Sequence, residues 1–289
     1  MTERGPEPHR PVRVTRWTAA GPEGERQDAV AAEEPLQVVL DGREFAVVMR
    51  TPGHDLELVL GLLFAEGVVR STADVAAAAV AASGLDAVDA ARLPFEVRAL
   101  PEAENLVELR LARPLAADAP VGWQRNLVAS SACGICGAAA LDALRRDLSP
   151  LAPGPSFPAA AIARLVPALR AAQRTFHLTG GLHAAGLFEP SGHLLAARED
   201  VGRHNAVDKL VGLAFLEGRL PLAGQALLVS GRASFELAQK AVAAGIPLLA
   251  AVSAPSSLAV HVAHTFGLTL VGFLRDTGWN VYAGAERIG

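Results

Sequence analysis

The chain has 289 residues, of which 51% are hydrophobic and 19% are charged, and its formal net charge is −4. This composition excludes a disordered chain and supports one large globular domain or two ordinary ones. It also argues against a nucleic-acid partner, because neutralising a phosphate backbone requires a surplus of basic residues. Aromatic residues are only 5%, so Ala, Leu and Val carry most of the apolar content, as in helices packed on a sheet.

Residues 1–34 are rich in Pro, Gly and charge, and we expect a mobile leader in which residues 12–17 have the pattern of an edge strand. They lack the apolar segment that a signal peptide needs. The most apolar run, residues 56–69, contains two glutamates. It is shorter than the roughly 18 apolar residues of a membrane span. These features predict a cytoplasmic protein with no membrane contact.

Three stretches before residue 128 have a regular pattern. Residues 35–50 alternate as two strands joined at Asp41-Gly42, the dipeptide preferred in a tight type I′ turn. A helix is expected over residues 55–66, and residues 105–114 alternate as a half-buried strand. We assign these elements to a small α+β region, residues 35–128.

The middle of the chain contains the cysteines and a candidate domain boundary. Residues 129–158 are expected to form a cysteine-bearing loop, a helix over 138–148 and a linker rich in Pro and Gly. A further helix is expected over residues 159–176. The last domain is then predicted to span residues 159–289.

From His183 onward, strands and helices alternate. Strands are expected at 183–189, 193–199, 226–230, 247–253 and 268–275, and helices at 205–217, 234–245 and 257–267. Together with the preceding helix, this order predicts a three-layer α/β/α fold like that of the cytidine deaminases. The zinc motifs of those enzymes, H-x-E and P-C-x-x-C, are replaced by "RHNAVDK" and "SGRASFE". Hydrolytic deamination is therefore disfavoured, and no metal site is predicted.

Polar residues concentrate at four strand ends of this domain, which are residues 179–185, 198–209, 230–236 and 272–278. Ligands bind at such ends because backbone N–H groups and helix dipoles are exposed there. The second cluster has a plainer interpretation, a solvated helix start capped by Asp200 or Asn205. Arg232 in the third cluster suits a phosphate or carboxylate, and a surface salt bridge is an equal alternative.

Cys133 and Cys136 are the only cysteines, in the segment "CGICG" before an expected helix. A helix N-terminus favours the thiolate, which would make one of them a nucleophile. A structural zinc half-site has the same spacing but needs two more ligands, for which His261 and His264 are the candidates. A dithiol oxidoreductase is a third interpretation, although its motif normally follows the first strand of a small βαβ domain.

Seven motifs in order make the chain similar to a known family, the FdhD sulfurtransferases, which are accessory proteins of formate dehydrogenase. The resemblance runs from about Pro35 to the C-terminus. The motifs are "MRTPGHDLELVLGLLFAEG", "CGICG", "TGGLHAA", "REDVGRHNAVDK", "SGRASFE" with Lys240, "SAPSSLA" and "GFLRDT".

The resemblance implies that a cysteine of the CxxC accepts sulfur from a cysteine desulfurase as a persulfide. The sulfur then passes to the molybdenum of the bis-molybdopterin guanine dinucleotide cofactor, which formate dehydrogenase requires. The resemblance also implies a zinc-free deaminase-like domain, a homodimer, and a site for the guanine nucleotide ends, of which GDP would be a partial mimic. We expect Cys133 to carry the sulfur and Cys136 to assist. The alternative is a CxxC redox or zinc-binding scaffold without sulfur transfer.

The guanine nucleotide end is expected to bind the segment Gly272, Phe273, Leu274, Arg275, Asp276 and Thr277, with help from Arg232. Gly272 permits close approach of the backbone, Phe273 offers a stacking face and Arg275 can pair with phosphate. Asp276 can accept hydrogen bonds from the guanine ring N–H and amino group. The alternative is an ordinary strand exit with Phe273 in the core. Separately, the few charges on helices 56–67 and 258–266 predict a homodimer.

Overall fold

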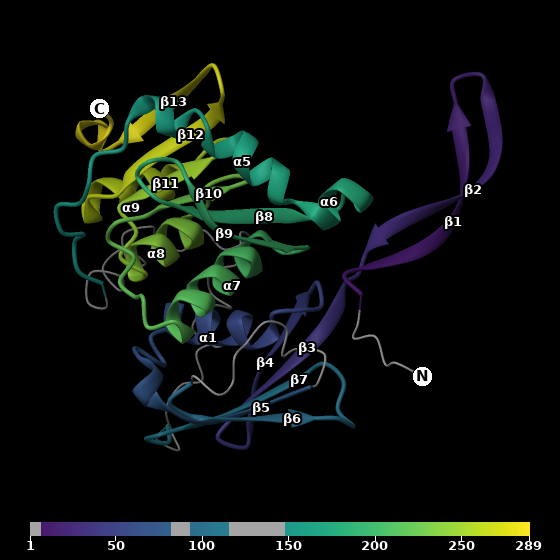
Figure 1. Ribbon diagram of the computed structural model, residues 1–289, viewed down its shortest axis with the longest axis horizontal. Coiled ribbons are helices and arrows are strands. Elements are labelled where there is room, and N and C mark those ends of the chain that lie inside the picture. Colours follow the sequence, from purple (N-terminus) through teal and green to yellow (C-terminus); the bar gives the residue numbers. More distant parts are fainter. Residues whose placement is uncertain (1–6, 82–92, 116–147) are drawn as a thin grey trace.

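The computed structural model describes residues 7–81, 93–115 and 148–289. Two mixed sheets lie at opposite ends of the body, with helices between them (Figure 1). The six-stranded sheet has the order β13-β12-β11-β10-β8-β9. Its strands are β8 (His183–Phe188), β9 (Leu194–Asp200), β10 (Ala226–Val229), β11 (Leu248–Ala251), β12 (Thr269–Arg275) and β13 (Gly278–Ala283).

Strands β10, β11 and β12 are parallel, and β8 pairs antiparallel with β10. The helices that connect them, α7 (Arg203–Leu216), α8 (Phe235–Ala243) and α9 (Ser257–Phe266), cover one face, while α4 (Ala159–Ile162) and α5 (Leu165–Ala172) cover the other. Side chains alternate between the faces, so Leu227 and Val229 pack toward α7 to α9 and Leu228 packs toward α5. The predicted three-layer deaminase-like fold is confirmed.

The predicted helix over residues 159–176 is wrong as a single element. The structure divides it into α4, α5 and α6 (Arg174–Thr179). Pro167 explains the first break, because it has no N–H to donate to the carbonyl of Ala163 and its ring crowds that carbonyl. Strand β13, which was not predicted, pairs antiparallel with β12 and forms the edge of the sheet.

The five-stranded sheet has the order β4-β3-β7-β5-β6. Its strands are β3 (Glu34–Leu40), β4 (Arg43–Arg50), β5 (Val75–Ala81), β6 (Glu96–Leu100) and β7 (Leu106–Leu111), and it carries helix α1 (Asp55–Ala65) and the turn η1 (Thr72–Asp74). Asp41 and Gly42 both have positive φ, 50° and 75°, as the predicted type I′ turn requires. The hairpin, α1 and β7 match the predicted elements, whereas β5 and β6 were not predicted.

Helices α1 and α7 join the two regions through direct backbone contact. A Cβ atom on Gly61 would lie 1.9 Å from the carbonyl oxygen of Asp208, and one on Gly212 would lie 1.8 Å from that of Glu57. Only glycine fits at either position. One hydrophobic core continues across this contact, from Leu36 in the five-stranded sheet to Leu249 in the six-stranded sheet.

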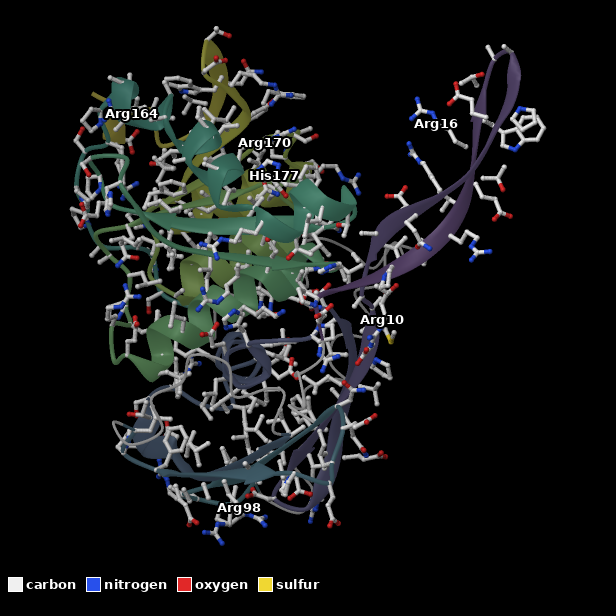
Figure 2. The ribbon with its side chains drawn as sticks, turned by 45° about the vertical axis from the view of Figure 1, so that its right-hand side comes forward. Arg10, Arg16, Arg98, Arg164, Arg170 and His177 are labelled. Carbon is white, nitrogen blue, oxygen red and sulfur yellow. The ribbon has the colours of Figure 1, made fainter. Side chains whose placement is uncertain are left out.

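The expected leader, residues 1–34, is corrected by the structure over most of its length. Strands β1 (His9–Thr18) and β2 (Gly21–Ala31) pair antiparallel into a long hairpin that projects from the body (Figure 1). Cross-strand ion pairs such as Arg16 with Glu23 line it, and Trp17 near its tip is 69% exposed. Figure 2 shows Arg16 far from the rest of the molecule. Among the described residues, no helix combines the length and apolar character needed to cross a membrane.

Candidate functional site

The carboxyl ends of β10 and β11 meet the beginning of β8 at one edge of the six-stranded sheet. Ser230 follows β10, and its hydroxyl accepts a hydrogen bond of 2.9 Å from the backbone N–H of Ala184. The backbone N–H of Ser253, just beyond β11, donates to the carbonyl of Gly231 at 3.2 Å. Ser253 in turn accepts a bond of 3.2 Å from the backbone N–H of Phe273. Three of the predicted polar clusters therefore meet here.

The remaining polar cluster, residues 198–209, lies at the same edge because Asp200 pairs with His183 across β8 and β9. Its interpretation as a solvated helix start is wrong for three of its charged members, since Asp200, Asp208 and Lys209 are all buried. Asp200 accepts bonds of 2.8 Å from the backbone N–H of Gly202 and 2.9 Å from the side chain of Asn205. These bonds fix the start of α7.

Two buried lysines neutralise the carboxylates behind the edge. The Lys209 ammonium lies 2.8 Å from the Asp200 carboxylate and donates to the carbonyl of Thr51 at 2.9 Å, which connects α7 to the end of β4. The Lys240 ammonium of α8 lies 2.6 Å from the Asp208 carboxylate. Burial raises the pKa of Asp208, and the charge of Lys240 opposes this shift. The two pairs connect α7 to the end of β4 and to the last turn of α8.

The beginnings of α7 and α8, in the segments "RHNAVDK" and "SGRASFE", carry a second polar group. His204 Nε2 lies 3.1 Å from the Ser234 hydroxyl and 3.7 Å from Glu236 Oε2. The interaction with His204 lowers the pKa of Glu236 to about 2. Within the part of the chain that the structure describes, no three His, Cys, Asp or Glu side chains are grouped to hold a metal ion.

His183 begins β8 beside this group. Burial is the main cause that lowers its pKa, and the nearby charges of Arg203 and His204 add to the shift. The imidazole is therefore neutral at neutral pH, with one nitrogen that donates and one that accepts. The site offers hydrogen-bonding capacity here without adding a formal charge.

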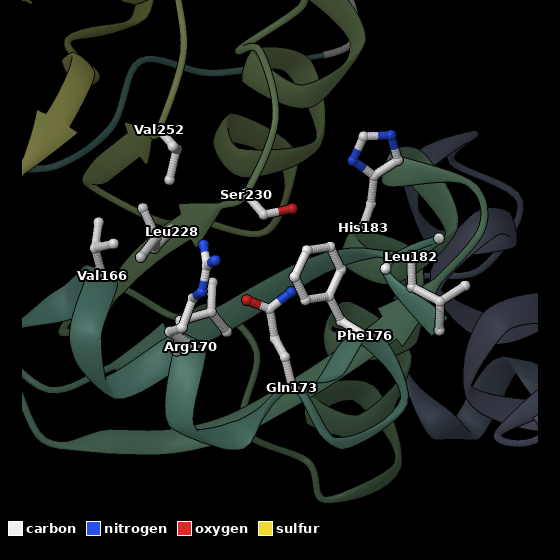
Figure 3. Close-up of a pocket in the computed structure, with 12 residues that line it drawn as sticks. Val166, Arg170, Gln173, Phe176, Leu182, His183, Leu228, Ser230 and Val252 are labelled. Carbon is white, nitrogen blue, oxygen red and sulfur yellow. The ribbon is translucent and has the colours of Figure 1, made fainter. Parts of the chain in front are cut away.

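A cavity of about 370 Å³ opens beside Ser230 and His183, between the sheet edge and helices α5 and α6 (Figure 3). Its apolar lining comes from Val166, Leu169, Leu182, Leu228 and Val252. Its polar and aromatic lining comes from Arg170, Gln173, Phe176, His183 and Ser230. An apolar cavity with few polar groups is the usual form of a small-molecule site.

Helix α6 is held in place beside the cavity by β9. The Glu199 carboxylate accepts bonds of 2.9 Å and 2.7 Å from the backbone N–H groups of Thr175 and Phe176, which satisfies donors at the start of the helix. The helix ends at Gly180, whose φ of 66° is left-handed. The glycines and His183 of this segment belong to a polar cluster that is visible in the sequence. Arg170, Gln173 and Phe176 were not predicted, because they precede the cluster in an ordinary helical pattern.

The predicted nucleotide segment, residues 272–277, lies in the hairpin of β12 and β13. Gly272 and Leu274 are buried, and a Cβ atom on Gly272 would lie 2.9 Å from both Pro255 and Tyr282. Phe273 has a φ of 53° and is 44% exposed, so its placement in the core is wrong. The register of the pairing shifts between Gly272 and Arg275, which is a β-bulge.

Arg275 connects this hairpin to the cavity. Its guanidinium donates to the carbonyls of Val252 at 2.6 Å and Leu274 at 2.7 Å, and Val252 also lines the cavity. Asp276 and Thr277 form the exposed turn beyond it. Arg232 is exposed and makes no ion pair with any described residue, so the salt-bridge alternative has no support there.

The cysteines Cys133 and Cys136 lie outside the described residues. The two histidines considered as partners for a zinc site, His261 and His264, are exposed on α9. Their exposure does not favour either interpretation of the cysteines.

Comparisons with known proteins agree with the resemblance found in the sequence. The model of the FdhD/NarQ family matches residues 31–289. A protein of Nocardia farcinica, named "Sulfur carrier protein FdhD", is 49% identical over 278 residues, which cover 96% of this chain and 93% of that protein. A Streptomyces avermitilis protein of the same name is 51% identical over 270 residues, covering 91% of this chain and 90% of that protein.

A solved structure shows the same fold. It is the crystal structure of a putative formate dehydrogenase accessory protein from Desulfotalea psychrophila. The match covers 98% of this chain and 100% of that chain, with a TM-score of 0.73 and 24% sequence identity. The extent of the family match, with close to half of the residues identical in full-length relatives, settles the family. This chain belongs to the FdhD/NarQ family.

Proposed function

We propose that this protein is a sulfur carrier that serves the maturation of formate dehydrogenase. The observation that carries the proposal is its similarity, over at least nine-tenths of its length, to proteins named as sulfur carriers. The chain has only two cysteines, three positions apart in "CGICG". Since sulfur is carried on thiols, these two residues are the natural site of the activity.

The sulfur donor in this proposal is a cysteine desulfurase that holds a persulfide. The Cys133 thiolate attacks the terminal sulfur of that persulfide, a new S–S bond forms on Cys133, and the donor cysteine leaves as its thiolate. The exchange is neutral in electrons, so it needs no added oxidant or reductant. Cys136, three positions further along the chain, assists as a second thiol.

The acceptor is the molybdenum of the bis-molybdopterin guanine dinucleotide cofactor, which is bound as a substrate. We propose that its guanine nucleotide end lies at residues 272–277, with GDP as a partial mimic. Support comes from Phe273, whose exposed ring is held in a strained backbone conformation, and from the adjacent guanidinium of Arg275. Arg232, Leu274, Asp276 and Thr277 complete the proposed segment.

A homodimer and a cytoplasmic location are also part of the proposal. Helix α1 does not support a dimer, because most of it is buried within the chain. Two strands at the edges of the described sheets support self-association instead, which are β4 with exposed Val47 and Met49, and β13 with exposed Val281.

Transfer of label tests the proposed function directly. Radiolabelled sulfur from cysteine should reach the guanine dinucleotide cofactor when the desulfurase and this protein are both present, and formate dehydrogenase loaded with that cofactor should become active. Label that reaches the cofactor equally well without this protein would contradict the proposal.

A further inference from the structure

The β1–β2 hairpin, residues 9–31, projects from the body as an arm that is uncovered along most of its length (Figure 1). Its two strands form a sheet of their own. The contact with α6 is at the end of β2, where the Ala31 side chain lies beside Gly181. An isolated two-stranded hairpin is only marginally stable in water. An arm with strands of 10 and 11 residues is therefore expected to pack on another molecule.

The root of the arm is bonded to the body. The backbone N–H of Ala32 donates to the carbonyl of Pro8 at 2.9 Å, and the Thr51 hydroxyl donates to the carbonyl of Ala32 at 3.0 Å. The backbone N–H of Thr51 in turn donates to the buried carboxylate of Asp200 at 3.2 Å. Because these bonds fix the direction of the arm, a partner meets a preformed surface, and little chain entropy is lost on association.

One face of the arm is apolar with a basic margin. Residues that pair directly across two strands point to the same face. The side chains on this face are Arg10, Val12, Val14, Arg16, Arg26, Asp28 and Val30. Val30 is 44% exposed, and the three arginines outnumber the one aspartate. Figure 2 shows Arg10 near the root and Arg16 farther out, so the basic margin follows the length of the arm.

The outer face of strands β3 and β4 has the complementary character. Helix α1 lies on the opposite side of the five-stranded sheet (Figure 1). The outward side chains of the two strands are Pro35, Gln37, Val39, Glu44, Val47 and Met49. Val47 and Met49 are 54% and 49% exposed, and Glu44 is the charged member of this set. This face is therefore apolar with an acidic end.

We infer that the arm of one chain packs its apolar face on the outer face of β3 and β4 in a second copy of this chain. In a two-fold dimer each chain gives one arm and receives one, so the contact occurs twice. A face about 30 Å long and 10 Å wide, used twice, buries on the order of 1,200 Å² in total, the lower limit of stable interfaces. The inference rests on the homodimer of the proposed function and names the surface that forms it.

The charges of the two faces favour this contact. Arg16 pairs with Glu23 inside the arm, but the two side chains are 51% and 49% exposed. An exposed pair of this kind contributes little to stability, so its guanidinium can turn toward a carboxylate of the second copy. Trp17, which is 69% exposed near the tip, adds an aromatic anchor at the far end of the contact.

Sedimentation equilibrium of the full chain tests the inference. Val14→Asp places a charge on the apolar face of the arm, and Val47→Asp places one on the receiving face. Each dimer contains the change twice, so each variant should raise the dimer dissociation constant by at least about tenfold. Gln27→Asp is the matched control, because Gln27 pairs with Arg13 on the opposite face of the arm. Its dissociation constant should equal that of the parent.

Photocrosslinking locates the arm without a charged substitution. The photoreactive residue p-benzoylphenylalanine is placed at Val14, and heavy-isotope chains are mixed with ordinary chains so that links between chains are recognised by mass. The expected link joins the arm of one chain to residues 34–50 of another. The same link should form when a cysteine desulfurase is added at equal concentration.

Three results would overturn the inference. They are a monomeric parent, equal dissociation constants for Val14→Asp and Gln27→Asp, and a crosslink that falls outside residues 34–50 of a second copy. A crosslink to the added desulfurase is of the last kind, because it would assign the arm to a different protein. Sulfur loading of the cysteines is measured separately on the parent, so failure of this inference is distinguishable from failure of the proposed function.

Discussion

The ammonium of Lys209 lies 2.8 Å from the carboxylate of Asp200, and the two side chains are 1% and 0% exposed. Removing one member of a buried ion pair leaves an uncompensated charge. Lys209→Met should therefore lower the free energy of unfolding by about 3–5 kcal/mol, measured by urea denaturation. Arg219→Met, which removes an exposed pair with Glu217, should change it by less than about 1 kcal/mol. Equal effects of the two variants would contradict this account of the network.

Because α1 and α7 are in close contact at Gly61 and Gly212, we expect any side chain at either position to destabilise the fold. Gly61→Ala and Gly212→Ala place a methyl group within 2 Å of a carbonyl oxygen, so the helices must separate. Each should cost about 3 kcal/mol or more in the free energy of unfolding. Gly224→Ala meets no atom within 4 Å and serves as the control, with a change near zero. The measurement is thermal or urea unfolding. If Gly61→Ala and Gly212→Ala were as stable as Gly224→Ala, the direct contact between the helices would be contradicted.

The pair of His204 and Glu236 predicts a defined loss of stability in acid. The pKa of Glu236 falls from 4.5 to about 2 on folding. A lowered carboxyl pKa stabilises the fold above the unfolded value, and this contribution is lost as the pH falls from about 4.5 toward about 2. Glu236→Gln lacks the contribution, so the difference in urea midpoint between parent and variant should shrink across that window. A constant difference would show that Glu236 does not titrate as described.

His183 should remain neutral at a pH where an ordinary histidine is half protonated. Burial and the charge of Arg203 lower its pKa from 6.5. Proton NMR at pH 6.5 should therefore show the His183 ring mainly in its neutral form, with a histidine in a short unstructured peptide as the reference. A fully protonated His183 signal at this pH would place the ring in a more polar setting than the structure does.

Two variants test whether residues 272–277 bind the guanine nucleotide, one for overall affinity and one for the preference for guanine. Arg275→Ala should lower the affinity for GDP and ADP alike by about tenfold, because it removes a phosphate partner. Asp276→Ala should weaken the preference for GDP over ADP, because it removes an acceptor for the guanine donors. Calorimetry measures both, with Arg219→Ala as the control. If both variants bind GDP as the parent does, the nucleotide lies elsewhere.

Much of the fold follows from local patterns in the sequence. The Asp41-Gly42 turn, helix α1 and the alternating elements after His183 match their expected places because their periods and turn residues are unambiguous. Pro167 is visible in the sequence as a helix-breaking residue, but the helical pattern around it led us to predict one continuous helix. Residues 12–17 of β1 alternate as expected for an edge strand, whereas β2 carries exposed charged residues such as Glu25, paired with Arg13, and has no hydrophobic period that would reveal the hairpin.

The candidate site was predictable only where its residues stand out in the sequence. His183 begins β8, Ser230 follows β10 and Arg275 ends β12, so all three lie in polar clusters that the sequence places at strand ends. Gln173 occupies a helical stretch in which an amide is normally exposed. Its burial depends on how α5 and α6 pack against β8 and β9, which is a tertiary property that no local pattern encodes.

The central claim is that Cys133 carries sulfur, and mass spectrometry of the intact protein tests it most directly. After incubation with a cysteine desulfurase and cysteine, the parent should gain one sulfur atom that a thiol reductant removes. Cys136→Ala should still accept sulfur, because only the first thiol is needed for the attack on the donor persulfide. Cys133→Ala should gain none, and an unchanged yield of sulfurated protein in that variant would contradict the claim.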